Sequence, residues 1–232
     1  MPGVDRAEAS RIAHGDLTLY NPLSEDALDE AIRLLALAPG ARVLDVACGR
    51  AEVLRRVVER YDVVPAGYDA DRALVESVPA ELNVKVADQP PEGTFDLVIC
   101  IASSHALGGF PDALDRLHGL VEPGGQLLLG EGYWRRPPSD EYLDALGGAT
   151  ADELSDYGGL MRAAENAGLT PLYASVASEA DWDTYEWRQV LNSERSGHPE
   201  LRERAEGGRR RLTMAGGRDT LGFALVLLAR HT

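Results

Sequence analysis

The stretch VLDVACGRAEVL, residues 43–54, decides the fold of this chain. It opens with the apolar residues of a buried strand that carries Asp45, and a helical pattern of apolar residues follows within a few positions. Small residues alternate through the turn between them, at Ala47, Gly49 and Ala51, so the turn backbone can approach a ligand closely. The first N–H groups of the following helix have no partner within it. The stretch therefore predicts a strand–turn–helix unit that binds a polar ligand at the turn.

Strands and helices alternate on both sides of this unit. Apolar runs predict strands over 43–46, 63–68, 84–87, 95–102 and 126–130. Helical spacing of apolar residues, with Pro and Gly as breaks, predicts helices over 27–38, 52–61, 71–78 and 111–121. This spacing is typical of βαβ units, so we expect an α/β fold with a doubly wound, mostly parallel sheet and right-handed crossovers.

The C-terminal part of the sequence is less regular. It predicts helices over 139–146, 151–167, 181–193 and 200–212, and strands over 172–177 and 221–229. Two late strands that flank a helical insertion suggest an antiparallel closing edge. No long linker interrupts the chain, so we expect one domain over 1–232. Its parts are a cap segment (1–23), a ligand-binding core (24–131) and a region of lid helices and closing strands (132–232).

Composition excludes several classes of function. The chain has 23 Lys and Arg against 38 Asp and Glu, a formal net charge of -15, which disfavours binding to nucleic acid or to anionic membranes. No uninterrupted apolar run is long enough to span a bilayer, and the stretch MPGVDRAEASRIAHGD lacks the apolar core of a signal peptide. Cys48 and Cys100 fit two reduced thiols rather than a zinc site. We expect a cytoplasmic protein without a metal.

Three predicted strands end near a carboxylate, at Asp45, Asp69 and Asp88. The carboxyl ends of parallel strands meet at one edge of the sheet, so these acids converge on one crevice unless each only caps a helix. An acid beside the glycine turn repels a pyrophosphate and attracts an ammonium group. A ligand with an amino-acid group at one end and a nucleoside at the other fits better, with Asp69 on the ribose and Asp88 on the base.

These residues resemble the motifs of class I S-adenosylmethionine-dependent methyltransferases. The matching segments are LDVACGRAE (44–52), AGYDADRAL (66–74), VKVADQPP (84–91), FDLVICIASSHAL (95–107) and LVEPGGQLLLGEGYW (120–134). Ala47 and Ala51 stand where the family's first motif has glycines. The segments occur in order and at the usual spacing over about 24–131, which makes the combined pattern specific.

The resemblance implies a Rossmann-like methyltransferase fold with seven strands, the last one antiparallel. It also implies S-adenosyl-L-methionine as cofactor, S-adenosyl-L-homocysteine as product and a small-molecule acceptor, as in a bacterial small-molecule subgroup. The segment before residue 24 is expected to fold over the cofactor. The cofactor-binding residues that it implies are Tyr20, Asp45, Ala47, Gly49, Asp69, Ala70, Asp88, Gln89, Ile101 and Ala102.

Three residues are candidates for removing a proton from the acceptor. His105 follows the fourth strand on the crevice side, although it could equally belong to a capping loop. Glu131 lies at the tip of the fifth strand, and Tyr157 begins a predicted helix. Trp182 and Tyr185 are three apart and share a helix face, so they either line an acceptor pocket or pack against the sheet.

Other functions fit the same sequence less well. A protein that uses the bound cofactor for cyclisation shares these motifs, and accumulation of S-adenosylhomocysteine would distinguish the two. A nicotinamide-dependent oxidoreductase needs the G-x-G-x-x-G fingerprint, which is missing here. A non-catalytic scaffold has no need of three converging acids. The sequence does not identify the acceptor or the atom that is methylated.

Overall fold

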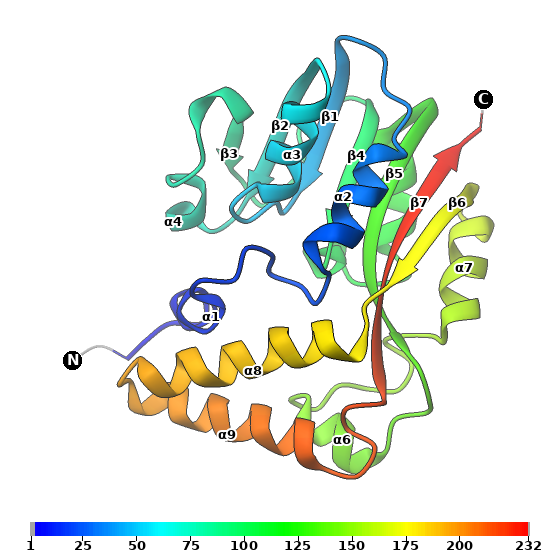
Figure 1. The fold of residues 1–232 in the computed structure, drawn as a ribbon. Coiled ribbons are helices and arrows are strands. Elements are labelled where there is room, and N and C mark those ends of the chain that lie inside the picture. Colours follow the sequence, from blue (N-terminus) through cyan, green and yellow to red (C-terminus); the bar gives the residue numbers. More distant parts are fainter. Residues whose placement is uncertain (1–2, 232) are drawn as a thin grey trace.

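A seven-stranded sheet runs through the centre of the computed structural model, which describes residues 3–231 (Figure 1). The strand order is β3-β2-β1-β4-β5-β7-β6, and β7 runs antiparallel to both of its neighbours. This confirms the expected sheet with its antiparallel last strand. The strands are β1 (Ala41–Val46), β2 (Val63–Asp69), β3 (Val84–Val86), β4 (Phe95–Ile101), β5 (Val121–Trp134), β6 (Leu169–Val176) and β7 (Leu221–Arg230).

Helices cover both faces of the sheet. The α-helices are α1 (Arg6–His14), α2 (Glu25–Arg33), α3 (Glu52–Arg60), α4 (Arg72–Val75), α5 (Ala113–Leu120), α6 (Asp140–Ala145), α7 (Tyr157–Asn166), α8 (Glu179–Arg195) and α9 (Pro199–Thr213). Neighbouring strand residues point to opposite faces, so Val43 joins the core under α2 and α3, whereas Leu44 joins the core under α5 and α7. Burial on both faces explains the continuous apolar runs of these strands.

Some element boundaries differ from the sequence-based expectation. β5 runs from Val121 to Trp134 rather than over 126–130. α7 begins at Tyr157 rather than at 151, because residues 151–154 form turns and bends and the Trp134 N–H donates to the Ser155 carbonyl at 2.8 Å. The helix expected over 71–78 is reduced to the single turn α4.

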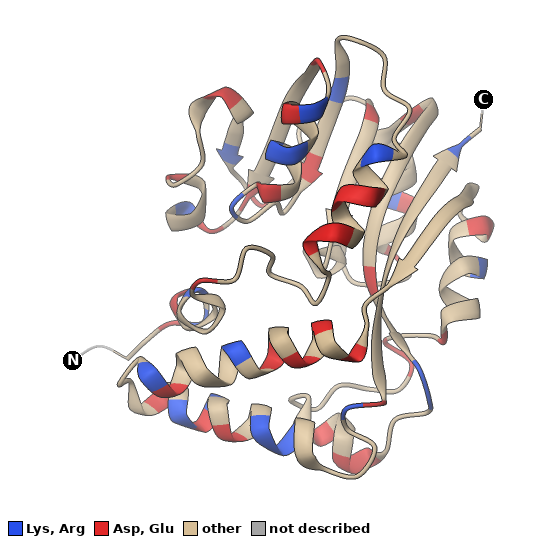
Figure 2. Ribbon diagram, viewed as in Figure 1, with Lys and Arg blue, Asp and Glu red and all other residues tan. Residues whose placement is uncertain are grey.

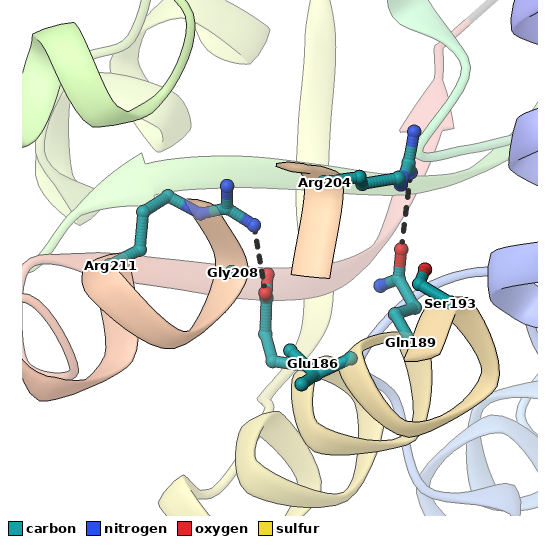
Figure 3. A pocket seen from close by; sticks show the side chains of 7 residues that line it. Glu186, Gln189, Ser193, Arg204, Gly208 and Arg211 are labelled. Atoms are coloured by element: carbon teal, nitrogen blue, oxygen red, sulfur yellow. Dashed lines mark hydrogen bonds and ion pairs between the residues drawn. The ribbon is translucent and has the colours of Figure 1, made fainter. Parts of the chain in front are cut away.

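Two long helices, α8 and α9, form an antiparallel hairpin beyond the ends of the strands, and α1 lies against α8 (Figure 1). We call this pair the lid hairpin. A small cavity lies between the two helices, where Arg211 pairs with Glu186 at 3.1 Å and Arg204 donates to Gln189 at 3.4 Å (Figure 3). Gly208 lets the helices approach closely at this cavity. These contacts make the hairpin a packed unit rather than two separate helices.

Acidic residues dominate α2, and the neighbouring helix α3 carries arginines that pair with them (Figure 2). Arg56 is only 12% exposed, and it pairs with Asp29 at 2.8 Å and with Glu25 on α2, as well as with Glu52 on its own helix. The excess of acids is thus partly neutralised within the fold. Over residues 3–231, no helix combines the length and the apolar character needed to cross a bilayer.

Candidate active site

Asp45 is buried at the end of β1, with 4% of its surface exposed. Burial raises the pKa of its carboxyl to about 8, and the charge of Asp69 adds to the shift, while the Leu54 N–H opposes it. A carboxyl in this state is stabilised by a cationic ligand, because a positive charge nearby favours the ionised form.

The turn after β1 has an unusual backbone. Ala47, Gly49 and Ala51 have φ angles of 48°, 57° and 56°, in the left-handed region that glycine adopts most readily. Ala51 is also the N-cap of α3, and it offers no side-chain cap. The Leu54 N–H of α3 is directed at Asp45, and the N–H groups of the two residues before it are left for a ligand. In contrast, α1, α2, α7 and α8 each begin with an Asp or Ser side-chain cap.

Asp69 joins two loops at the end of β2. Its Oδ2 accepts the Gly49 N–H and its Oδ1 accepts the Asp71 N–H, both at 2.8 Å. Each carboxylate oxygen can accept a further hydrogen bond, and the side chain is only half-buried. Asp69 is therefore oriented by the backbone and still open to a ligand hydroxyl.

The other expected cofactor residues lie along the same edge of the sheet. Ala70 is exposed beside Asp69, and Asp88 and Gln89 are exposed in the bend that follows β3. Ile101 ends β4, and Ala102 has a φ of 57° and donates its N–H to the Gly130 carbonyl at 2.8 Å. Parallel pairing of β1, β2, β3 and β4 brings these loops to one edge of the sheet.

The three candidate bases differ in environment. Glu131 is 7% exposed; its Oε1 accepts the Gly132 N–H at 2.9 Å, and its Oε2 has no hydrogen-bond partner among the described residues. Burial raises the pKa of Glu131, and the Ser104 hydroxyl opposes the shift. His105 is exposed in the short 3-10 helix η2 (Ser104–Leu107). Tyr157 is 39% exposed, and its ring meets Tyr133 edge-on at 5.5 Å.

The segment that we call the strap, residues 5–23, was only partly predicted, because α1 was missed. Arg11 of α1 pairs with Asp71, in the loop that follows β2. Arg50 of the glycine turn donates to the Gly15 carbonyl at 3.3 Å and lies over the Tyr20 ring at 5.1 Å. The strap is thus tied to the loops of both Asp45 and Asp69.

The strap is tied to the lid hairpin as well. His14 stacks on Tyr20 with 4.1 Å between ring centroids, and its Nε2 lies 3.1 Å from the Tyr185 hydroxyl. Burial lowers the pKa of His14. Asn192 of α8 donates to the Ala13 carbonyl at 3.1 Å. One sequence signal for α1 was available, since Asp5 followed by Glu8 is a helix-start pattern, and Asp5 accepts the Glu8 N–H at 2.8 Å.

A sheet of order 3-2-1-4-5-7-6 with an acid-bearing glycine turn after β1 defines a class I methyltransferase fold. A family model described as "Methyltransferase domain" matches residues 22–172. The chain belongs to this methyltransferase family, and the class predicted from its motifs is confirmed.

Several solved structures share this fold. The uncharacterized protein YjhP of Escherichia coli (strain K12) is 26% identical over 197 residues, which cover 79% of each chain. Its X-ray structure superposes with a TM-score of 0.85, 22% identity and coverage of 96% of this chain and 99% of that one. A methyltransferase from Geobacter sulfurreducens, solved with S-adenosyl-L-homocysteine, gives a TM-score of 0.84 at 20% identity, covering 98% and 99%. One from Thiobacillus denitrificans, with the same ligand, gives 0.78 at 24% identity, covering 98% and 99%.

Proposed function

We propose that this chain transfers a methyl group from S-adenosyl-L-methionine to a small-molecule acceptor. The observation that carries the proposal is the Asp69 carboxylate, whose two oxygens are oriented by the N–H groups of Gly49 and Asp71. The lone pairs that remain suit the two hydroxyls of a ribose. The solved relatives with S-adenosyl-L-homocysteine support the same ligand for this fold.

The rest of the crevice suits the two ends of this cofactor. Buried Asp45 and the uncapped start of α3 complement the ammonium and carboxylate of its amino-acid end. Asp88 and Gln89 are available to the adenine. The remaining residues that we assign to the cofactor are Tyr20, Ala47, Gly49, Ala70, Ile101 and Ala102.

The cofactor supplies an already activated methyl group, so the protein's task is to align the nucleophile, exclude water and remove a proton where one must leave. Glu131, His105 and Tyr157 are the candidates for this last role. Burial raises the pKa of Glu131, so its carboxylate is a stronger base than that of an exposed glutamate. His105 and Tyr157 are exposed rather than buried.

Calorimetry tests the cofactor assignment. S-adenosyl-L-homocysteine should bind with micromolar affinity, and NADH should not bind. On turnover with S-adenosyl-L-methionine, S-adenosyl-L-homocysteine should accumulate in equal amount to the methylated product. Binding of NADH without a response to S-adenosyl-L-homocysteine contradicts the proposal. Turnover of an acceptor without any S-adenosyl-L-homocysteine favours the cyclisation alternative instead.

A further inference from the structure

Glu131 is the first residue of β5 that extends beyond the end of β4. The last paired residues of the two strands are Ile101 and Gly130, and the chain of β4 turns away at Ala102. The switch in strand order lies between β1 and β4, one strand away. Glu131 therefore lies at the edge of the sheet where the parallel strands end, next to the β4 end of the expected cofactor site.

The Glu131 carboxyl is only half satisfied by the protein. Oε1 accepts the Gly132 N–H, whereas Oε2 is buried without a hydrogen-bond partner in the part of the chain that is described. The Ser104 hydroxyl lowers the pKa of this carboxyl but makes no hydrogen bond to Oε2. An unpartnered carboxylate oxygen in a buried position is costly, and a ligand that donates a hydrogen bond to it removes the cost. An acceptor that is itself a carboxylate would be repelled.

A pair of tyrosine rings lies further along β5 from Glu131. Tyr133 is two residues further along β5, so its side chain is on the same face of the sheet as that of Glu131. Its ring packs edge-on against Tyr157, which keeps 39% of its surface exposed at the start of α7. A buried carboxylate and a tyrosine pair that begins on the same sheet face can bind the charged group and the body of an organic cation.

We infer that the methyl acceptor is a small organic amine, whose N–H group donates to Glu131 Oε2 and whose body packs against Tyr157; this inference rests on the proposed function. Glu131 takes up a proton from the ammonium form of the amine. The nitrogen lone pair then forms the bond to the methyl carbon. The sulfur–methyl bond breaks, and its electron pair stays on sulfur. The proton held by Glu131 leaves to solvent.

Matched probe compounds test this inference. The first set is 2-phenylethylamine, 2-phenylethanol and 3-phenylpropionate, and the second is hexylamine, hexanol and heptanoate. Binding of each compound is measured by calorimetry in the presence of S-adenosyl-L-homocysteine, and methyl transfer is measured with S-adenosyl-L-methionine. At least one amine should bind and be methylated, while its alcohol and carboxylate partners should do neither.

Variants test whether Glu131 and Tyr157 bind the amine. Glu131→Gln should weaken amine binding by roughly 10- to 100-fold, because a charge-assisted hydrogen bond is lost, with affinity for S-adenosyl-L-homocysteine unchanged. Tyr157→Leu should weaken amine binding by about 3- to 10-fold, and Tyr157→Phe should restore most of it, because the ring face is kept. Glu165→Gln, on the exposed side of α7, is the matched control and should bind amines as the wild type does.

Three results would overturn the inference: none of the amines binds, an alcohol or carboxylate binds as well as its amine, or Glu131→Gln binds amines as tightly as the wild type. Each is judged only where the protein binds S-adenosyl-L-homocysteine normally. A wild-type protein that does not bind S-adenosyl-L-homocysteine would contradict the proposed function itself. Failure of the proposed function is therefore distinguishable from failure of the amine inference.

Discussion

Asp69 Oδ2 accepts the Gly49 N–H at 2.8 Å, across a sequence separation of 20 residues. This bond joins the glycine turn after β1 to the acid after β2, so two motifs that are separate in the sequence form one rigid corner of the crevice. A change at either residue is expected to affect the binding of both ends of a cofactor.

Replacing Asp69 tests this corner directly. Asp69→Ala should weaken the binding of S-adenosyl-L-homocysteine by roughly 10- to 100-fold, because it removes charge-assisted hydrogen bonds to the ribose. It should also lower the free energy of unfolding of the ligand-free protein by about 1 kcal/mol, since the Gly49 and Asp71 N–H groups lose their acceptor. Calorimetry and urea unfolding measure the two effects. Asp62→Ala, on the exposed loop before β2, should change neither. Unchanged affinity in Asp69→Ala would leave Asp69 a structural residue only.

Asp45 should make stability depend on pH. Burial raises its pKa in the folded protein to about 8, whereas in the unfolded chain the carboxyl has a pKa of about 4. Between these values the folded state holds a proton that the unfolded state releases. The free energy of unfolding should therefore fall as pH rises through this window, by up to about 1.4 kcal/mol per pH unit from this group.

The variant Asp45→Asn isolates this contribution, because it cannot ionise. In urea unfolding between about pH 5 and pH 8, the wild type should lose stability relative to the variant as pH rises. Asp62→Asn should instead follow the wild type throughout. Parallel pH curves for the wild type and Asp45→Asn would show that Asp45 keeps an ordinary pKa. The asparagine variant should also bind S-adenosyl-L-homocysteine more weakly, since it lacks a charge for the ammonium group.

The ion pair between Arg11 and Asp71 should slow the release of the cofactor. Both side chains are partly buried, with 28% and 16% exposed. Removing either partner, in Arg11→Gln or Asp71→Asn, should loosen the strap and raise the dissociation rate of S-adenosyl-L-homocysteine several-fold. A double-mutant cycle measured by stopped flow should give a coupling of about 1 kcal/mol. The exposed pair of Arg72 and Glu76 should give a coupling near zero. Additive effects for Arg11 and Asp71 would show that they act independently.

Two neighbouring glycines of α9 should respond in opposite ways to alanine. A Cβ at Gly207 would meet only Arg211 Nη1, at 4.0 Å, whereas at Gly208 it would lie 2.8 Å from Val190 Cγ2. Gly207→Ala should raise the free energy of unfolding by about 0.5–1 kcal/mol through helix propensity. Gly208→Ala should be less stable than Gly207→Ala by at least about 1 kcal/mol, because it pushes α8 and α9 apart. Equal stabilisation of both variants in urea unfolding would show that the lid hairpin packs loosely.

Local sequence patterns were enough to predict the sheet and the acids at the ends of its strands. Strands such as β4 are buried on both faces, so they form apolar runs that end at polar or small residues, and parallel pairing then brings Asp45 and Asp69 together. The shared face of Trp182 and Tyr185 also followed from helical spacing, and their rings lie 6.2 Å apart.

Long-range contacts account for what the sequence did not predict. α1 has a weak apolar pattern, and partners distant in the chain hold it in place, such as Asn192, which is 179 residues from Ala13. The unpartnered oxygen of Glu131 depends on how β5 and β7 extend beyond β4, which no local pattern encodes.

The docking of α1 against α8 has a consequence for synthesis of the protein. A ribosome extends the chain from its N-terminus, so residues 6–14 emerge long before residues 179–195 exist. During that interval His14 has neither Tyr185 nor the packed hairpin to bind. A nascent chain can form the cofactor turns of β1 and β2 early, but the strap can close over them only when the last helices have been made. The strap is therefore held in place only after α8 has been made, and fragments that end before α8, which also lack β7, should bind the cofactor weakly.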